Sequence, residues 1–242
     1  MRYGIFSDIH SNLEALEAVA ARYAREGIEQ YFCAGDVVGY AANPNECVAL
    51  VKKYAFVTVA GNHDWACVGL CDAMQFNLFA TQALEWTRAR LSDESRDFLR
   101  SLRLEFVNKD LTLVHGSLDN PEEFDYMFDS AAASRTFRIL KTQVCFVGHT
   151  HVAGYFVMDR HSAIQYRQDA SLALEDGNRY IVNVGSVGQP RDGNPCAAYC
   201  IYDTEKKEIS IKRTEYQIDF ARKKILESGL SRSLGDRLLT GS

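Results

Sequence analysis

Apolar and polar positions follow two periods along the chain, and these periods predict strands that alternate with helices. Two predicted helices connect the first three predicted strands. Ser11 or Asn12 caps the first helix, and the second begins at Asn43-Pro44. Those strands cover residues 2–7, 31–34 and 56–59. This order favours parallel pairing with right-handed crossovers.

Residues 65–103 have a helical period instead. Apolar side chains recur on one helical face between Phe76 and Trp86, and Ser92 is placed to cap a further helix. We therefore expect a small helical insertion at about 65–103.

The second half of the chain again predicts strands, followed by one helix at 218–226. The predicted strands are 111–114, 144–147, 155–158, 164–166 and 180–182, with a final hairpin formed by 198–202 and 209–211. The last dozen residues are polar, and we expect them to be loose.

Composition limits the type of protein. The chain has 242 residues, of which 47% are hydrophobic and 24% charged, which predicts a single globular domain over 1–242 that includes the insertion. The net charge of −5 provides no basic field for long nucleic acid, and no apolar run is long enough for a membrane span or a signal peptide. We expect a cytoplasmic protein with no membrane partner, and the sequence does not indicate an oligomeric state.

The seven cysteines are expected to be free thiols, because their number is odd and no secretory signal precedes them. Cys67-x3-Cys71 and Cys196-x3-Cys200 lack the two-residue spacing of zinc ribbons, which favours ordinary core or surface thiols.

Candidate chemistry lies where predicted strands end. Five such loops carry His, Asp or Asn: Asp8-Ile9-His10, Gly35-Asp36, Gly61-Asn62-His63-Asp64, His115-Gly116 and Gly148-His149-Thr150-His151. Loops after the carboxyl ends of strands in open α/β sheets form the ligand crevice, so these side chains are expected to converge.

The histidines strengthen this interpretation. Five of the six lie in these loops, and only His161 lies elsewhere. Asp8-x-His10 by itself indicates a helix cap beside a surface histidine, and Gly35-Asp36 by itself indicates a turn. Together the motifs offer imidazole, carboxylate and amide ligands, a set that suits first-row divalent metals and is too rich in nitrogen for calcium.

This ordered set of motifs, spread over about residues 1–195, resembles the calcineurin-like metallophosphoesterase superfamily. The resemblance is closest to its small bacterial and archaeal phosphodiesterase branch. It implies an α/β fold, a four-layer α/β/β/α sandwich with two mixed sheets, here carrying the helical insertion.

The resemblance also implies two divalent metal ions, Mn, Fe, Ni or Zn, as cofactors. Asp8, His10, Asp36 and His151 would hold one ion, and Asp36, Asn62, His115 and His149 the other, with Asp36 bridging. Such a pair of ions activates a shared water for attack on phosphorus. His63 is then the catalytic acid that faces the substrate. Asp64 would orient His63, or would instead brace its loop.

Two further positions are candidates for substrate contact. Arg191 lies in the glycine-rich stretch 183–192, which either only closes the sheet or brings Arg191 to a phosphate, since Arg binds phosphate bidentately. Asn77 opens a helix of the insertion and either reaches a phosphate or caps that helix. Phe76, Phe79 and Trp86 pack between helices or stack on a base.

These residues predict an enzyme that hydrolyses small phosphate esters. Phosphodiesters are the leading substrates, with nucleotides or dinucleoside polyphosphates as a subset. A phosphomonoesterase is the alternative enzyme, and a non-catalytic metal-binding scaffold the alternative of another class. Val38-Gly39-Tyr40 and Asp64 depart from the motifs of the protein serine/threonine phosphatases of the superfamily, which argues against that activity.

Overall fold

Two mixed β-sheets form the centre of the molecule. The computed structural model describes residues 1–72 and 76–242. In the first sheet the order is β3 (Val57–Thr58), β2 (Gln30–Cys33), β1 (Arg2–Phe6), β11 (Ala197–Asp203), β12 (Glu208–Thr214) and β9 (Ser171–Ala173). In the second it is β4 (Glu105–Val107), β5 (Thr112–Val114), β6 (Val144–Val147), β10 (Arg179–Asn183), β7 (Gly154–Met158) and β8 (Ile164–Arg167).

The βαβαβ opening predicted from the sequence is confirmed, because β1, β2 and β3 pair in parallel. β11 then pairs with β1 antiparallel and forms the expected hairpin with β12, so the sheet is mixed. In the second sheet β10 pairs in parallel with β6 and antiparallel with β7.

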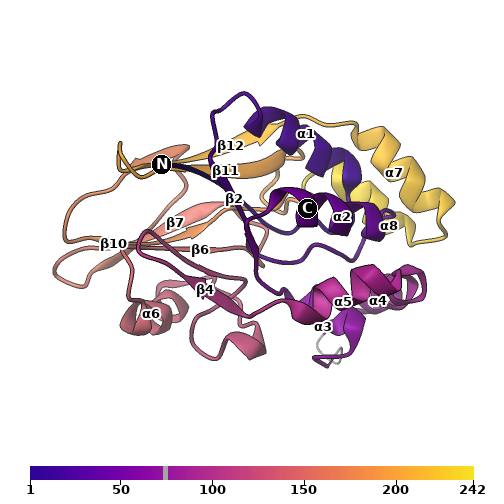
Figure 1. Ribbon diagram of the computed structural model, residues 1–242, viewed down its shortest axis with the longest axis horizontal. Helices are drawn as coiled ribbons and strands as arrows, with labels where there is room; N and C mark the ends of the chain where they lie inside the picture. The colour runs from indigo at the N-terminus through magenta and orange to yellow at the C-terminus, as the bar shows by residue number, and fades with distance from the viewer. Residues whose placement is uncertain (73–75) are drawn as a thin grey trace.

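Helices cover the outer faces of both sheets (Figure 1). α1 (Leu13–Tyr23) and α2 (Pro44–Tyr54) pack on the first sheet, and α6 (Ser130–Ile139) packs on the second. Side chains of β1 alternate between the two interfaces: Tyr3 and Ile5 face the second sheet, whereas Phe6 faces the helices. The expected α/β/β/α sandwich is confirmed.

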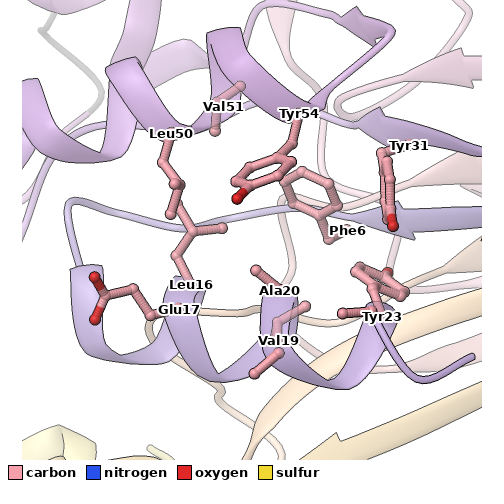
Figure 2. A pocket seen from close by; sticks show the side chains of 12 residues that line it. Phe6, Leu16, Glu17, Val19, Ala20, Tyr23, Tyr31, Leu50, Val51 and Tyr54 are labelled. Carbon is pink, nitrogen blue, oxygen red and sulfur yellow. The ribbon is translucent and has the colours of Figure 1, made fainter.

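α1 and α2 lie on opposite sides of an apolar cavity of about 380 Å³ over the first sheet. Figure 2 shows Leu16 and Tyr23 of α1 facing Leu50 and Tyr54 of α2 across this space. Glu17 contributes the carboxylate at its margin. Side chains of this kind supply no ligand set for a metal.

The insertion is helical, as predicted, and lies to one side of the sheets (Figure 1). It consists of α3 (Asn62–Val68), α4 (Leu78–Arg90) and α5 (Asp93–Ser101). Ser92 caps α5 by accepting a hydrogen bond from the amide of Ser95. α3 begins at Asn62 rather than at 65, so the Gly61-Asn62-His63-Asp64 motif forms its first turn.

The prediction of a loose C-terminal end is wrong. After α7 (Ile218–Glu227), the chain forms α8 (Arg232–Asp236) and the 3₁₀ turn η2 (Arg237–Leu239). Leu234 and Leu238, four residues apart, lie on one helical face and are buried with Ala221 and Ile225 of α7. Burial of these two leucines against α7 packs a largely polar segment onto the rest of the protein.

Four other elements were not predicted: α6, β4, β9 and the 3₁₀ turn η1 (Pro121–Glu123). The core positions of α6 include the small residues Ala132 and Ala133, which give a weak apolar period. β4 and β9 have three residues each, too few for a period of two to be visible.

Within residues 1–72 and 76–242, no helix combines the length and apolar character that a membrane crossing requires. All seven cysteines are free thiols, as expected.

Candidate metal centre

The predicted ligands meet where strands of both sheets end. Asp8 and Asp36 follow β1 and β2 of the first sheet, and His115 and His149 follow β5 and β6 of the second. Hydrogen bonds join the loops directly: the amide of His10 donates to the carbonyl of Asp36 (3.0 Å). The ends of the two sheets therefore meet at one layer of buried polar side chains, and we call this layer the floor of the site.

Two groups of side chains on this floor can each hold an ion. The first ligand group contains Asp8, His10, Asp36 and His151, and the second contains Asp36, His115 and His149. In each group the ligand atoms lie within 4.8 Å of one another. The groups share Asp36, as the predicted ligand sets do. Asn62 was predicted for the second set, and its Oδ1 is buried without a hydrogen-bond partner.

The backbone is strained at these positions. Asp8, His10, Asp36, His149 and His151 all have φ between 49° and 68°, in the left-handed region that side chains other than glycine rarely occupy. Each such residue costs on the order of 1–3 kcal/mol, and such strain clusters at functional sites. The fold therefore holds these ligand side chains in place even though their backbones adopt an unfavourable conformation.

Two glycines allow the loops to approach the carboxylates. A Cβ at Gly61 would clash with the carboxylate of Asp36, and a Cβ at Gly148 would clash with that of Asp8. The amide of His149, next to Gly148, donates to both oxygens of Asp8 (3.2 and 3.0 Å). These glycines are thus required by close contact rather than by a positive φ.

Backbone carbonyls set the tautomers of three histidines. Nδ1 of His10, His115 and His151 lies 3.1, 2.7 and 2.6 Å from the carbonyl oxygens of Val38, Ala34 and Gln189. A carbonyl only accepts, so each Nδ1 carries a proton, and in the neutral ring each Nε2 keeps the lone pair that can bind a metal. Histidine ligands of metals are oriented in this way.

The Nε2 atoms converge with no donor between them, which is the arrangement a cation requires. Nε2 of His10 and Nε2 of His151 are 3.0 Å apart, and the latter is 3.2 Å from Oδ1 of Asp8. Nε2 of His115 makes no hydrogen bond, although Oδ2 of Asp36 is 3.3 Å away, and Nε2 of His149 has no partner. Acceptors placed so closely repel one another unless a positive charge lies among them, so the residues fit two divalent cations.

The buried charges shift one another's pKa. Burial acts to raise the pKa of Asp36, but the charges of His115 and His63 lower it well below its usual range. Burial acts to lower the pKa of His115, but the charge of Asp36 raises it to about 9. Burial and the charge of His115 lower the pKa of His149 to about 3. A cation that binds here displaces the proton of His115, because metal ligands must be deprotonated.

His63 lies beside the two groups, held by packing and not by Asp64. Its ring contacts those of Tyr40, His10 and Phe76 at centroid distances of 4.5, 4.8 and 4.7 Å. Nδ1 is buried without a partner, and its amide donates to Oδ1 of Asp36 (2.9 Å). Burial lowers the pKa of His63 to about 4, against the charge of Asp36, which raises it.

Asp64 braces the loops, so the structure does not place it as the partner that orients His63. Its carboxylate accepts hydrogen bonds from the amides of Val37 (2.9 Å), Val38 (3.2 Å) and Gly61 (3.0 Å). Consecutive residues of a helix point about 100° apart, which directs His63 and Asp64 to different sides of α3. Burial and the charge of Asp36 raise the pKa of Asp64 to about 7.

A cavity of about 560 Å³ opens above the floor, and we name it the His63 cavity. Asn62, His63 and His149 line its base. Arg191 also lines it, with Nη2 3.4 Å from the hydroxyl of Tyr40 and 3.1 Å from Oε1 of Gln189, while Nε is buried without a partner. Both predicted substrate contacts, Arg191 and Asn77, thus reach the same cavity.

Asn77 also caps α4, since Oδ1 accepts a hydrogen bond from the amide of Ala80 (3.0 Å). Phe76 lines the cavity, whereas Phe79 is exposed and Trp86 donates its indole N–H to the carbonyl of Ser228. Residues of the cavity that the sequence did not indicate include Tyr40, Asp72, Glu122, Glu123, Phe124 and Tyr126.

The stretch 183–192 supports the floor from behind. The hydroxyl of Ser186 donates to the carbonyl of Asp8 (2.8 Å), as does the amide of Gly188 (2.9 Å). Asp192, next to Arg191, forms an ion pair with Arg213. This segment therefore supports the floor and places Arg191 at the cavity, and contact of Arg191 with a phosphate stays a prediction.

Comparison with known proteins agrees with this geometry. A family model described as the calcineurin-like phosphoesterase superfamily domain matches residues 1–207. An uncharacterized protein of Methanocaldococcus jannaschii is 38% identical over 241 residues, which cover 98% of this chain and 97% of that one.

Among solved structures, a metallophosphoesterase from Sphaerobacter thermophilus superimposes with a TM-score of 0.89 at 40% identity. The match covers 100% of this chain and 99% of that one. A hypothetical protein from Pyrococcus horikoshii, 19% identical, gives a TM-score of 0.80 over 100% of this chain and 98% of its own, and this likeness concerns the fold alone.

Proposed function

Because this chain belongs to the calcineurin-like phosphoesterase superfamily, we propose that it hydrolyses small phosphodiesters at a centre of two divalent cations. Mn, Fe, Ni and Zn are the candidate ions, since each accepts imidazole and carboxylate ligands. The observation that carries the proposal is the pair of ligand groups that share Asp36 at the base of the His63 cavity.

We propose that the predicted ligands bind two separate ions. Asp8, His10, Asp36 and His151 are proposed to hold one ion, and the second group with Asn62 the other. When bound, such a pair of ions acts as a Lewis acid that activates water and polarises the phosphoryl oxygens. The protein supplies a buried site whose ligands are already oriented by backbone carbonyls.

His63 is proposed to meet the oxygen of the leaving group. Its Nδ1 lacks a partner, and its ring is fixed by three aromatic neighbours, so little ordering is needed when a substrate binds. A bound phosphate anion raises the pKa of the adjacent imidazole above its value of about 4. His63 can then donate a proton, a contribution typically worth ~10²–10⁴-fold.

The size of the cavity favours diesters over monoesters. The cavity of about 560 Å³ is lined by His63 and His149 as well as by Phe76 and Tyr126, which leaves room for a second ester substituent. Arg191 is the cationic side chain among the lining residues, and one guanidinium suits the single negative charge of a diester better than the double charge of a monoester.

The experiment compares two activated esters. The purified protein, stripped of metal and reloaded with Mn²⁺ or Zn²⁺, is assayed with bis(p-nitrophenyl) phosphate and with p-nitrophenyl phosphate. We expect kcat/KM to be higher for the diester. A higher value for the monoester would instead establish the phosphomonoesterase alternative.

A full complement of metal with no hydrolysis of either ester would favour the non-catalytic scaffold. Nucleotides and dinucleoside polyphosphates belong in the same panel, since Phe76 and Tyr126 offer aromatic surface in the cavity. Long nucleic acid and membranes are not proposed partners.

A further inference from the structure

Tyr40 belongs to neither ligand group, yet it lies against three residues of the site. Its side chain is buried and lines the His63 cavity. The ring contacts those of His63 and His10 at centroid distances of 4.5 and 4.6 Å. The hydroxyl oxygen lies 3.4 Å from Nη2 of Arg191. One side chain thus connects the candidate acid, a predicted metal ligand and the candidate phosphate contact.

The fold holds Tyr40 in this place against its backbone preference. Tyr40 has a φ of 58°, in the left-handed region that a tyrosine rarely adopts, and Gly39 before it has a φ of 99°. The amide of Ala41, which follows, donates to the carbonyl of His10 (3.1 Å). Tyr40 also belongs to the buried cluster that contains Leu234 of α8. Strain of this kind clusters at functional sites, and here it fixes the ring before a ligand binds.

The same turn determines which nitrogen of His63 faces the cavity. A Cβ at Gly39 would lie 2.6 Å from Nδ1 of His63, so the backbone closes that edge of the imidazole and leaves Nε2 for a substrate. Within the described residues, neither ring nitrogen of His63 forms a hydrogen bond. The orientation of the imidazole therefore depends on its ring contacts, among which Tyr40 is the closest.

Arg191 depends on the hydroxyl of Tyr40 instead of its ring edge. Nη2 of Arg191 donates to this hydroxyl and to Oε1 of Gln189 (3.1 Å), and the guanidinium carbon lies 5.7 Å from the centroid of the Tyr40 ring. Among the residues that the structure describes, no carboxylate forms an ion pair with Arg191. A neutral hydroxyl orients the guanidinium without neutralising it, which keeps its charge for a phosphate.

On the basis of the proposed function, we propose that Tyr40 is a positioning residue with two separate effects on the reaction. Its ring holds His63 with Nε2 toward the leaving group, and its hydroxyl holds Arg191 toward the phosphate. Loss of the hydroxyl is therefore expected to weaken substrate binding, whereas loss of the ring is expected to impair proton donation as well.

The test combines two variants with two diesters that differ in the leaving group. Tyr40→Phe removes the hydroxyl, and Tyr40→Leu removes the ring. Methyl p-nitrophenyl phosphate releases nitrophenolate, which departs without a proton, whereas methyl phenyl phosphate releases the more basic phenolate, which requires one. The metal content, kcat and KM are measured for the metal-reconstituted protein and for each variant.

Tyr40→Phe should raise KM for both diesters by about threefold at unchanged kcat, because Gln189 still holds Arg191 after the hydrogen bond to the hydroxyl is lost. In Tyr40→Leu, kcat for methyl phenyl phosphate should fall by about tenfold or more, and kcat for the nitrophenyl ester by less than about threefold, because only phenolate depends on proton donation. Both variants should bind as much metal as the unaltered protein, since His10 keeps its hydrogen bond to Val38.

Tyr23→Phe is the matched control for the loss of a buried hydroxyl. Tyr23 is buried, its hydroxyl donates to the carbonyl of Ile5 (2.9 Å), and it is absent from the lining of the His63 cavity. Its kcat and KM should equal those of the unaltered protein, whatever the change in melting temperature. If Tyr40→Leu does not fold, Tyr40→Met takes its place, since methionine fills irregular space without a ring.

Three results would overturn the inference. Equal losses of kcat for the two diesters in Tyr40→Leu would indicate a structural effect and not impaired proton donation. A lower metal content in that variant would show that Tyr40 acts through His10. An unchanged KM in Tyr40→Phe would remove the hydroxyl from the placement of Arg191. In each case, hydrolysis by the unaltered protein leaves the proposed function standing. If the unaltered protein hydrolyses neither diester, both proposals fail together.

Discussion

The base of the His63 cavity is buried and held from behind, whereas its outer wall is largely open to solvent. Asp8, Asp36 and the four histidines of the ligand groups expose at most 4% of their surface, and three of those histidines are anchored by carbonyls. On the outer wall Tyr126 is 48% exposed, and Glu122 and Glu123 make no ion pair in the described part of the chain.

This contrast indicates that the base of the cavity carries metal binding and catalysis, whereas the outer wall determines the choice of substrate. A side chain at the base has lost its freedom before any ligand arrives, so a change there is expected to affect metal binding and every substrate alike. A side chain at the outer wall belongs to neither ligand group, so a change there is expected to affect KM and the choice of substrate. The following predictions test this division in order of expected effect.

Removal of metal should have the largest effect. Chelation and dialysis are expected to lower kcat/KM for bis(p-nitrophenyl) phosphate by more than about a thousandfold, since Lewis-acid stabilisation is worth several kcal/mol. The melting temperature should fall too, because ions that bind only the folded state stabilise it. Restored activity on adding Mn²⁺ or Zn²⁺ completes the measurement, and full activity in the chelated protein would refute the metal centre.

His63→Ala should lower kcat by ~10²–10⁴-fold while the metal content is retained, since His63 belongs to neither ligand group. The loss should be greater for an alkyl ester than for a nitrophenyl ester, because nitrophenolate leaves without a proton. His161→Ala is the control, as His161 is exposed in another part of the chain. Turnover of the alkyl ester at the normal rate would exclude proton donation by His63.

Arg191→Ala should raise KM by about tenfold with a smaller change in kcat, because a hydrogen bond to a charged group contributes about 1.5–3 kcal/mol. Metal content should stay the same, since Arg191 lies on the cavity side of the floor. Arg138→Ala, an exposed arginine on α6, is the control. An unchanged KM for every active substrate would place Arg191 outside the substrate contacts.

Asn77→Ala should have the smallest effect on catalysis. The lost cap of α4 costs about 1 kcal/mol of unfolding free energy, as should Ser92→Ala at the cap of α5, which makes the two variants a matched pair. Denaturant unfolding measures the cost in both. If KM rises in Asn77→Ala alone, Asn77 contacts the substrate in addition to capping its helix.

The sequence predicted the floor of the site better than its wall, for a physical reason. Strand ends are visible in the apolar pattern, and His10, Asp36 and His149 follow them directly. Their convergence then follows from the common edge of the sheets. Glu122 belongs to the 3₁₀ turn η1 and Tyr126 follows it. The path of the chain here depends on left-handed residues such as Phe124, and no periodic pattern in the sequence indicates it.

Two functions were weighed for Asp64 from the sequence, and its hydrogen bonds match the bracing of the loop rather than the orientation of His63. α3 begins at Asn62, so the adjacent side chains of His63 and Asp64 point in different directions. The C-terminal helix was also missed, because polar residues surround Leu234 and Leu238 in the sequence. Burial of the two leucines depends on contact with α7. The core strands were predicted correctly because each depends on a pattern within a single segment, whereas the four-layer sandwich was expected from the family resemblance.

The shared carboxylate is the centre of this account, and counting ions in the Asp36→Asn variant tests it most directly. Elemental analysis of the metal-reconstituted protein should give two ions per chain for the unaltered protein and fewer than one for the variant, since both ligand groups contain Asp36. Loss of exactly one ion, or unchanged metal content in a folded variant, would contradict a bridging Asp36.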